Sequence, residues 1–105
     1  TGKYLADPAA SGRLTLWPSF GQRYGKPNVI PAVTAYAALA KKHGLSLSQL
    51  ALGFARSRWF VSSTIIGASS LAQLKETLPA TRALISDEVL AEIDAIHLRY
   101  TNPAP

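Results

Sequence analysis

The stretch Ser63–Thr77, which reads STIIGASSLAQLKET, carries the clearest indication of the fold to which this chain belongs. The β-branched residues at its start, with Val61 just before them, predict a short buried strand over residues 61–66. A helix is predicted to follow through about Leu78 and to be ended by Pro79. The stretch therefore predicts a strand, a turn and a helix in immediate succession.

The turn between this strand and helix has the composition of an anion site. The first amides of a helix favour negative charge, and Gly67 would allow a ligand to approach the backbone closely. Ser69 and Ser70 add hydroxyl donors, and Gln73 follows Ser70 at the spacing of a capping box. A serine before a helix is more often only a cap, so spacing alone leaves both interpretations open.

Three further helices are predicted on either side of this stretch. The first covers residues 29–43 with Asn28 as its cap, the second begins at Ser46 and the third begins at Ser86. Their apolar faces are expected to contain Val29, Val33, Tyr36 and Ala40, then Leu47, Leu50, Ala51 and Phe54, and finally Val89, Ile93, Ile96 and Tyr100. Residues 1–28 read as a long irregular loop rich in glycine, proline, basic and aromatic residues.

The single predicted strand is a hint that this chain is part of a longer polypeptide. One strand cannot form a sheet, so either the strand prediction is wrong or its neighbours lie on polypeptide that is absent here. The chain also begins at Thr1 and contains no methionine, which favours a truncated or processed product.

The composition excludes several classes of protein. With 48% hydrophobic and 16% charged residues, the 105-residue chain is expected to fold rather than to be disordered. The absence of cysteine excludes a disulfide scaffold and a thiolate metal site. His43 and His97 lie far apart without metal-ligand spacing, so no metal site is predicted. No apolar run is long enough for a membrane span and the start does not resemble a signal peptide, which favours a soluble cytoplasmic protein.

The quoted stretch resembles the last barrel strand and the following helix of aldo-keto reductases, whose pattern is close to I-x-G-A-S-x-x-x-Q-L-x-E-N. It departs from that pattern at Thr77, where many relatives have asparagine. Three more markers resemble the family in the same order along the chain: Thr1–Tyr4, His43–Leu52 and Leu90–Ile96. The resemblance implies an α/β parent fold, a (β/α)8 TIM barrel of about 250 residues. Residues 1–105 would form its C-terminal part, with residues 1–28 as a long cofactor-side loop and residues 29–105 as the helices and the strand.

The resemblance also implies a function, namely an NADP-dependent oxidoreductase that reduces aldehydes and ketones to alcohols. It implies cofactor-binding roles for six residues: Lys3 beside the pyrophosphate, Arg13 pairing with the 2′-phosphate and stacking on adenine, Gly67 and Ser69 at the phosphate, and Gln73 and Glu76 along the adenosine. The family's catalytic aspartate, tyrosine, lysine and histidine lie on earlier strands. No catalytic residue is therefore expected in this chain, and the isolated piece is expected to be inactive.

Two other interpretations fit parts of the sequence. The net charge of +5 and the two helices Ser46–Arg58 and Ser70–Leu78 could indicate a small helical nucleic-acid-binding module. The second of these helices contains no arginine, however, and the linker is about ten residues where a helix-turn-helix needs roughly three or four. The piece could also fold as a helical domain that binds no ligand. It would then expose its barrel-facing sides and is expected to self-associate.

Overall fold

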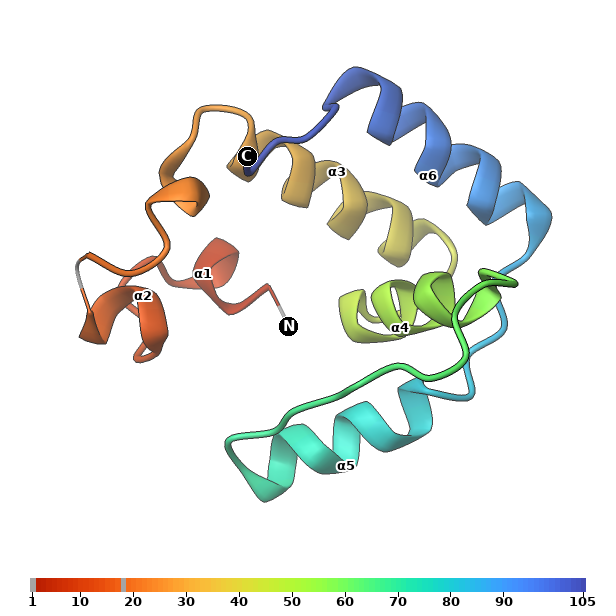
Figure 1. Ribbon diagram of the computed structural model, residues 1–105, viewed down its shortest axis with the longest axis horizontal. Helices are drawn as coiled ribbons and strands as arrows, with labels where there is room; N and C mark the ends of the chain where they lie inside the picture. The colour runs from red at the N-terminus through yellow and green to blue at the C-terminus, as the bar shows by residue number, and fades with distance from the viewer. Residues whose placement is uncertain (1, 18) are drawn as a thin grey trace.

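All the regular elements in the part of the chain that the structure describes are helices (Figure 1). The structure is a computed structural model that describes residues 2–17 and 19–105. Its elements are α1 (Lys3–Ala6), α2 (Arg13–Leu16), the 3-10 turn η1 (Gln22–Gly25), α3 (Val29–Lys42), α4 (Leu47–Ser57), α5 (Leu71–Ala80) and α6 (Asp87–Arg99). Helix α3 packs on α4 and α6, α5 packs on α4, and α1 contacts α3. None of the helices formed by the described residues has the length and apolar character that crossing a membrane requires.

The core lies where the apolar faces of α3, α4 and α6 meet. Its buried members are Leu39, Ala40, Leu50, Val89 and Ile93. Leu39 and Ala40 come from α3, and Val89 and Ile93 lie one turn apart on α6, as one face of a helix requires. The predicted apolar faces are confirmed in part, because Ala40, Leu50, Val89 and Ile93 are buried. Burial of each large aliphatic side chain contributes about 1.5–3 kcal/mol, so this cluster is the main favourable contribution to the packing of the three helices.

The turn between α3 and α4 is defined by local hydrogen bonds. After His43, the C-cap residue of α3, Gly44 takes a positive φ of 66°, a backbone conformation that residues with a side chain rarely adopt. The amide of Leu45 donates to the carbonyl of Ala40 at 2.8 Å, and the amide of Gly44 donates to that of Lys41 at 3.2 Å. This pair of bonds is a Schellman motif, which ends α3 and turns the chain toward α4.

The predicted capping box at the start of α4 is confirmed. The amide of Gln49 donates to Ser46 Oγ at 3.1 Å, and the amide of Ser46 donates to Gln49 Oε1 at 2.7 Å. Each side chain thus satisfies a backbone amide that the helix itself cannot.

The predicted strand over residues 61–66 is wrong for this structure. These residues have no regular secondary structure and lie between α4 and α5 as a chain segment without ladder hydrogen bonds (Figure 1). A strand is defined by hydrogen bonds to a neighbouring strand, and the described residues provide none. The β-branched residues favour a strand conformation, but a strand cannot form without a neighbouring strand to pair with.

Three smaller predictions are also corrected. Pro79 lies inside α5, which ends at Ala80. The helix tolerates the proline there because, in the last turn, it removes only one amide hydrogen bond. Asn28 makes no side-chain cap to α3, since its backbone is already helical, with φ −85° and ψ −7°. The loop over residues 1–28 is less irregular than expected, because α1, α2 and η1 lie within it.

Removal of the α4 cap should have a measurable cost. Ser46→Ala is expected to lower the free energy of unfolding by about 1 kcal/mol, because the amide of Gln49 loses its acceptor. Urea unfolding followed by far-ultraviolet circular dichroism measures this change. Ser48→Ala is the matched control in the same helix turn and is expected to change the free energy by less than about 0.5 kcal/mol. Equal losses in the two variants would contradict the assignment of the cap.

Candidate functional site

The turn before α5 is held by a capping arrangement that differs from the predicted one by one residue. The amide of Gln73 donates to Ser70 Oγ at 3.2 Å, as predicted. The side chain of Gln73 returns to Ser69 rather than to Ser70, because its Oε1 accepts from the Ser69 amide at 2.7 Å and from Ser69 Oγ at 3.1 Å. Two of the predicted cofactor residues, Ser69 and Gln73, are therefore bonded to each other.

This turn is open to solvent and can accept an anion. Gly67, Ser69 and Ser70 are exposed, and no atom lies within 4 Å of the position where a Cβ on Gly67 would be. The first amides of a helix lack acceptors within that helix, and Ser70 Oγ satisfies only the amide of Gln73 among them. Those of Leu71 and Ala72 remain at the positive end of the helix dipole, where an anion is favoured.

The two basic residues of the predicted site, Lys3 and Arg13, lie in or beside α1 and α2. Lys3 Nζ donates to the carbonyl of Ser11 at 2.8 Å and lies 5.0 Å from the centre of the Tyr4 ring. The guanidinium of Arg13 lies 5.2 Å from the centre of the Phe20 ring. Arg13 therefore already makes, with a side chain of this chain, the kind of contact that was predicted for adenine.

The structure does not bring the six predicted residues together. Within residues 2–17 and 19–105, no hydrogen bond or ion pair links Lys3 or Arg13 to the turn before α5. Figure 1 shows α1 and α2 apart from α5: α1 contacts α3, whereas α5 packs on α4. Glu76 lies one turn beyond Leu71 and Ala72 on α5 and is exposed. The predicted site is thus two separate parts in this chain.

Tyr4 and Thr15 organise the α1–α2 region, and sequence reasoning did not identify them for this purpose. Tyr4 Oη accepts from the amide of Leu14 at 3.2 Å. Thr15 Oγ1 accepts from the amide of Gly12 at 3.0 Å and lies 3.0 Å from the carbonyl of Ala10, to which it donates. Hydrogen bonds made by side chains therefore connect α1 with α2 and fix the turn before α2. No regular spacing in the sequence predicts such contacts.

Substitution of Gly12 is expected to disrupt this region. A Cβ at Gly12 would lie too close to the Lys3 ammonium and the Tyr4 hydroxyl, so Gly12→Ala should displace these two side-chain ends and loosen the link between α1 and α2. Limited trypsin digestion measures the effect as faster cleavage after Arg13. Gly25→Ala is the matched control, because nothing lies within 4 Å of its Cβ position. Unchanged cleavage in Gly12→Ala would contradict the close packing of Lys3, Tyr4 and Gly12.

Comparison with known proteins gives the family of the chain. Residues 5–98 match the sequence model of the Aldo/keto reductase family. The chain is 46% identical over 107 residues to Protein tas of Escherichia coli (strain K12), covering 100% of this chain and 30% of that protein. It is 36% identical over 108 residues to an aldo-keto reductase of Babesia bovis, covering 98% of this chain and 38% of that protein. It is 31% identical over 99 residues to L-galactose dehydrogenase of Arabidopsis thaliana, covering 90% of this chain and 31% of that protein.

The chain spans about a third of the length of these curated relatives. The family match nevertheless extends over most of its residues, from the end of α1 to the last turn of α6. The chain therefore belongs to the aldo-keto reductase family.

Proposed function

We propose that this chain is the C-terminal part of an NADP-dependent aldo-keto reductase, a (β/α)8 barrel enzyme that reduces aldehydes and ketones to alcohols. In this proposal residues 1–105 contribute the surface that holds the adenosine 2′-phosphate end of the cofactor. The observation that carries it is the open turn before α5, with its amides and the hydroxyls of Ser69 and Ser70, in a chain of this family. A cytoplasmic location is part of the same proposal.

The residues of this turn fit a phosphate group. Gly67 leaves space for a ligand to approach the backbone, and the amides of Leu71 and Ala72 lie at the positive end of the α5 dipole. Ser69 can turn its hydroxyl from Gln73 Oε1 to a phosphate oxygen, which is the stronger acceptor because it is charged. Gln73 and Glu76, on the next turn of the same helix, would bind the adenosine.

Lys3 and Arg13 would supply the positive charge that a 2′-phosphate and a pyrophosphate require. The guanidinium of Arg13 combines a planar face for adenine with donors for the phosphate, which an ammonium cannot do equally well. Its present position supports this role, since its guanidinium already lies 5.2 Å from the centre of an aromatic ring, that of Phe20. In the proposal, α1 and α2 lie nearer to α5 in the complete barrel than in this chain.

The chain would bind and orient the cofactor without taking part in the chemical step. When bound, the nicotinamide cofactor supplies the hydride that reduces the carbonyl group. The catalytic residues of the family lie on polypeptide outside this chain, so the 105-residue chain alone is expected to show no reductase activity.

Binding of adenosine 2′,5′-bisphosphate tests the cofactor role. Calorimetric titration of the complete enzyme, in which α1 and α2 would lie near α5, is expected to show saturable binding, weakened about tenfold or more by Arg13→Ala, because a charge-assisted hydrogen bond contributes about 1.5–3 kcal/mol. Ser69→Ala is also expected to weaken binding by about tenfold or more, since its hydroxyl would donate to a charged phosphate oxygen and such a bond contributes about 1.5–3 kcal/mol.

The controls separate a specific site from general attraction to a basic chain. Arg23→Ala removes the same charge from η1 and should leave the affinity nearly unchanged. Adenosine 5′-monophosphate lacks the 2′-phosphate, so its binding should be weakened less by Arg13→Ala than binding of the bisphosphate, because only the stacking on adenine is lost. Equal weakening by Arg13→Ala and Arg23→Ala would contradict the site. Salt-dependent binding of duplex DNA in place of the nucleotide would favour the nucleic-acid alternative, which neither the fold nor the family match supports.

We also propose that the chain associates with itself when it is alone. Trp59, Ile65 and Leu84 have exposed fractions of 94%, 97% and 91%. An apolar cavity of about 500 Å³ also opens between α3, α4 and α6, lined by residues such as Val33, Leu47 and Phe54. Such surfaces are costly in water and promote association.

Sedimentation velocity at increasing concentration tests this association. The chain is expected to sediment as a species larger than a monomer, and Ile65→Lys is expected to increase the monomer fraction. Thr34→Lys adds the same charge at an exposed polar position of α3 and should not change it. A monomer at all concentrations would contradict the proposal.

A further inference from the structure

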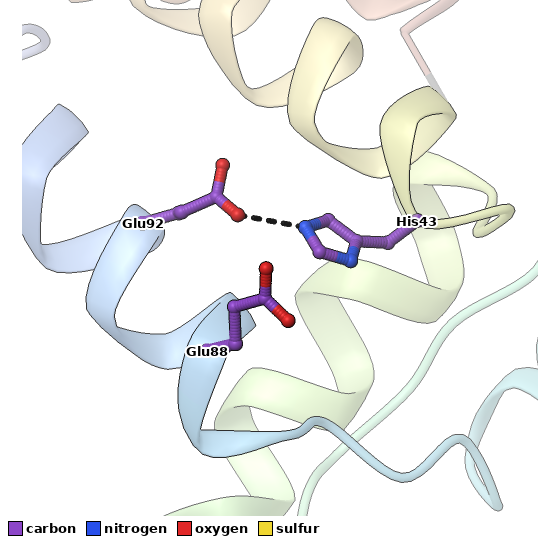
Figure 2. Close-up of side chains that lie close together, drawn as sticks. All are labelled: His43, Glu88 and Glu92. Atoms are coloured by element: carbon purple, nitrogen blue, oxygen red, sulfur yellow. Dashed lines mark hydrogen bonds and ion pairs between the residues drawn. The ribbon is translucent and has the colours of Figure 1, made fainter.

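Three potential metal ligands meet where the end of α3 lies against the first half of α6 (Figure 2). They are His43, Glu88 and Glu92, and one ligand atom from each lies within 4.8 Å of the others. His43 Nε2 is 2.8 Å from Glu92 Oε1. The cluster combines an imidazole with two carboxylates and shares no residue with the proposed cofactor surface.

Two packed helices, α3 and α6, position these three ligands. Glu88 and Glu92 are one turn apart on α6, so their side chains lie on the same face of the helix. His43 is the C-cap residue of α3, and the positive φ of Gly44 directs the chain away immediately after it. Core residues of α3 and α6 pack against each other beside the cluster, which keeps the two helices at this spacing. His43 has a side-chain exposure of only 18%, so its ring is also restrained by packing.

One cation, the ammonium of Lys42, already contacts this cluster. Lys42 Nζ lies 2.9 Å from both carboxylate oxygens of Glu92. The hydrogen bond from Lys42, followed by that of His43, lowers the pKa of Glu92, and the bond to Glu92 raises the pKa of Lys42. Glu88 has no hydrogen bond or ion pair with any residue that the structure describes. Two carboxylates at this spacing repel each other unless a cation lies between them.

We propose that His43, Glu88 and Glu92 bind one Zn²⁺ ion that joins the end of α3 to α6. Zinc takes nitrogen and oxygen ligands at about 2.0–2.2 Å and accepts three protein ligands with water in the fourth position. Calcium and magnesium prefer oxygen ligands alone, so the imidazole of His43 selects a transition metal. Small side-chain rotations would bring the donors to these distances. Lys42, whose side chain is 59% exposed, would turn into solvent and leave Glu92 to the metal.

Zinc titration of the 105-residue chain tests this site. Calorimetry at neutral pH is expected to show one Zn²⁺ per chain, and zinc is expected to raise the midpoint of thermal unfolding, because it binds only the folded arrangement of three separated residues. Glu88→Gln and His43→Gln are each expected to weaken zinc binding by at least about tenfold, the scale on which even outer partners of a metal ligand act. Co²⁺ in place of Zn²⁺ gives a visible absorption spectrum that both variants should lose.

Two matched controls accompany these variants. Asp87→Asn changes the neighbouring carboxylate of α6, and His97→Gln changes the other imidazole of the chain, and neither residue belongs to the cluster. Both should bind zinc like the unmodified chain. Circular dichroism verifies folding, and Glu88→Gln is the decisive variant because Glu88 is exposed and its loss removes no contact that holds the fold.

Several results would overturn the proposal. It fails if zinc binding is undetected, if it survives both Glu88→Gln and His43→Gln, or if Asp87→Asn weakens it equally. It also fails if Mg²⁺ binds as tightly as Zn²⁺, since that would indicate a general acidic surface in which His43 has no part. None of these outcomes depends on NADP, so the cofactor proposal can fail or hold independently.

Discussion

The burial of Leu50 between α3 and α6 is the contact on which the rest of this chain depends. Helices of this length are marginal in water when isolated, so most of their stability must come from packing. Leu50 has an exposed fraction of 4%, and it lies in one cluster with Leu39 of α3 and Val89 of α6. Once these helices meet, the end of α3 lies against α6 and α5 can pack on α4. Leu45 and Ile85, in the segments that connect the helices, pack against the same core.

The sequence predicted correctly the features that depend on contacts within a few residues along the chain. The apolar spacing identified α3, α4 and α6, and the cap of α4 followed from Ser46 and Gln49, because a capping box needs only its own turn. Gly44 ended α3 for an equally local reason, its left-handed backbone. The family could be identified from the sequence for a related reason, since its markers are contiguous motifs.

The features that were missed or wrong depend on residues distant in the sequence. The strand over residues 61–66 was predicted from side-chain type, yet a strand exists only with a neighbour. His43 meets Glu92 across 49 positions because α3 and α6 pack together, and no spacing in the sequence announces that contact. The candidate cofactor residues show both cases. Ser69 and Gln73 meet within one turn, whereas the relation of Lys3 and Arg13 to that turn depends on tertiary structure.

Ile65, in the segment without regular structure before α5 (residues 61–66), contributes little to the stability of this fold. A side chain stabilises a fold only to the extent that its exposure differs between the folded and the unfolded chain. Ile65 is 97% exposed in the folded chain, so its hydrophobicity contributes almost nothing to the stability of this structure. The packing of the helices therefore places almost no demand on the identity of residue 65. An isoleucine at this position has its energetic effect only where another polypeptide covers it, which makes the segment informative about surroundings that the rest of the chain does not specify.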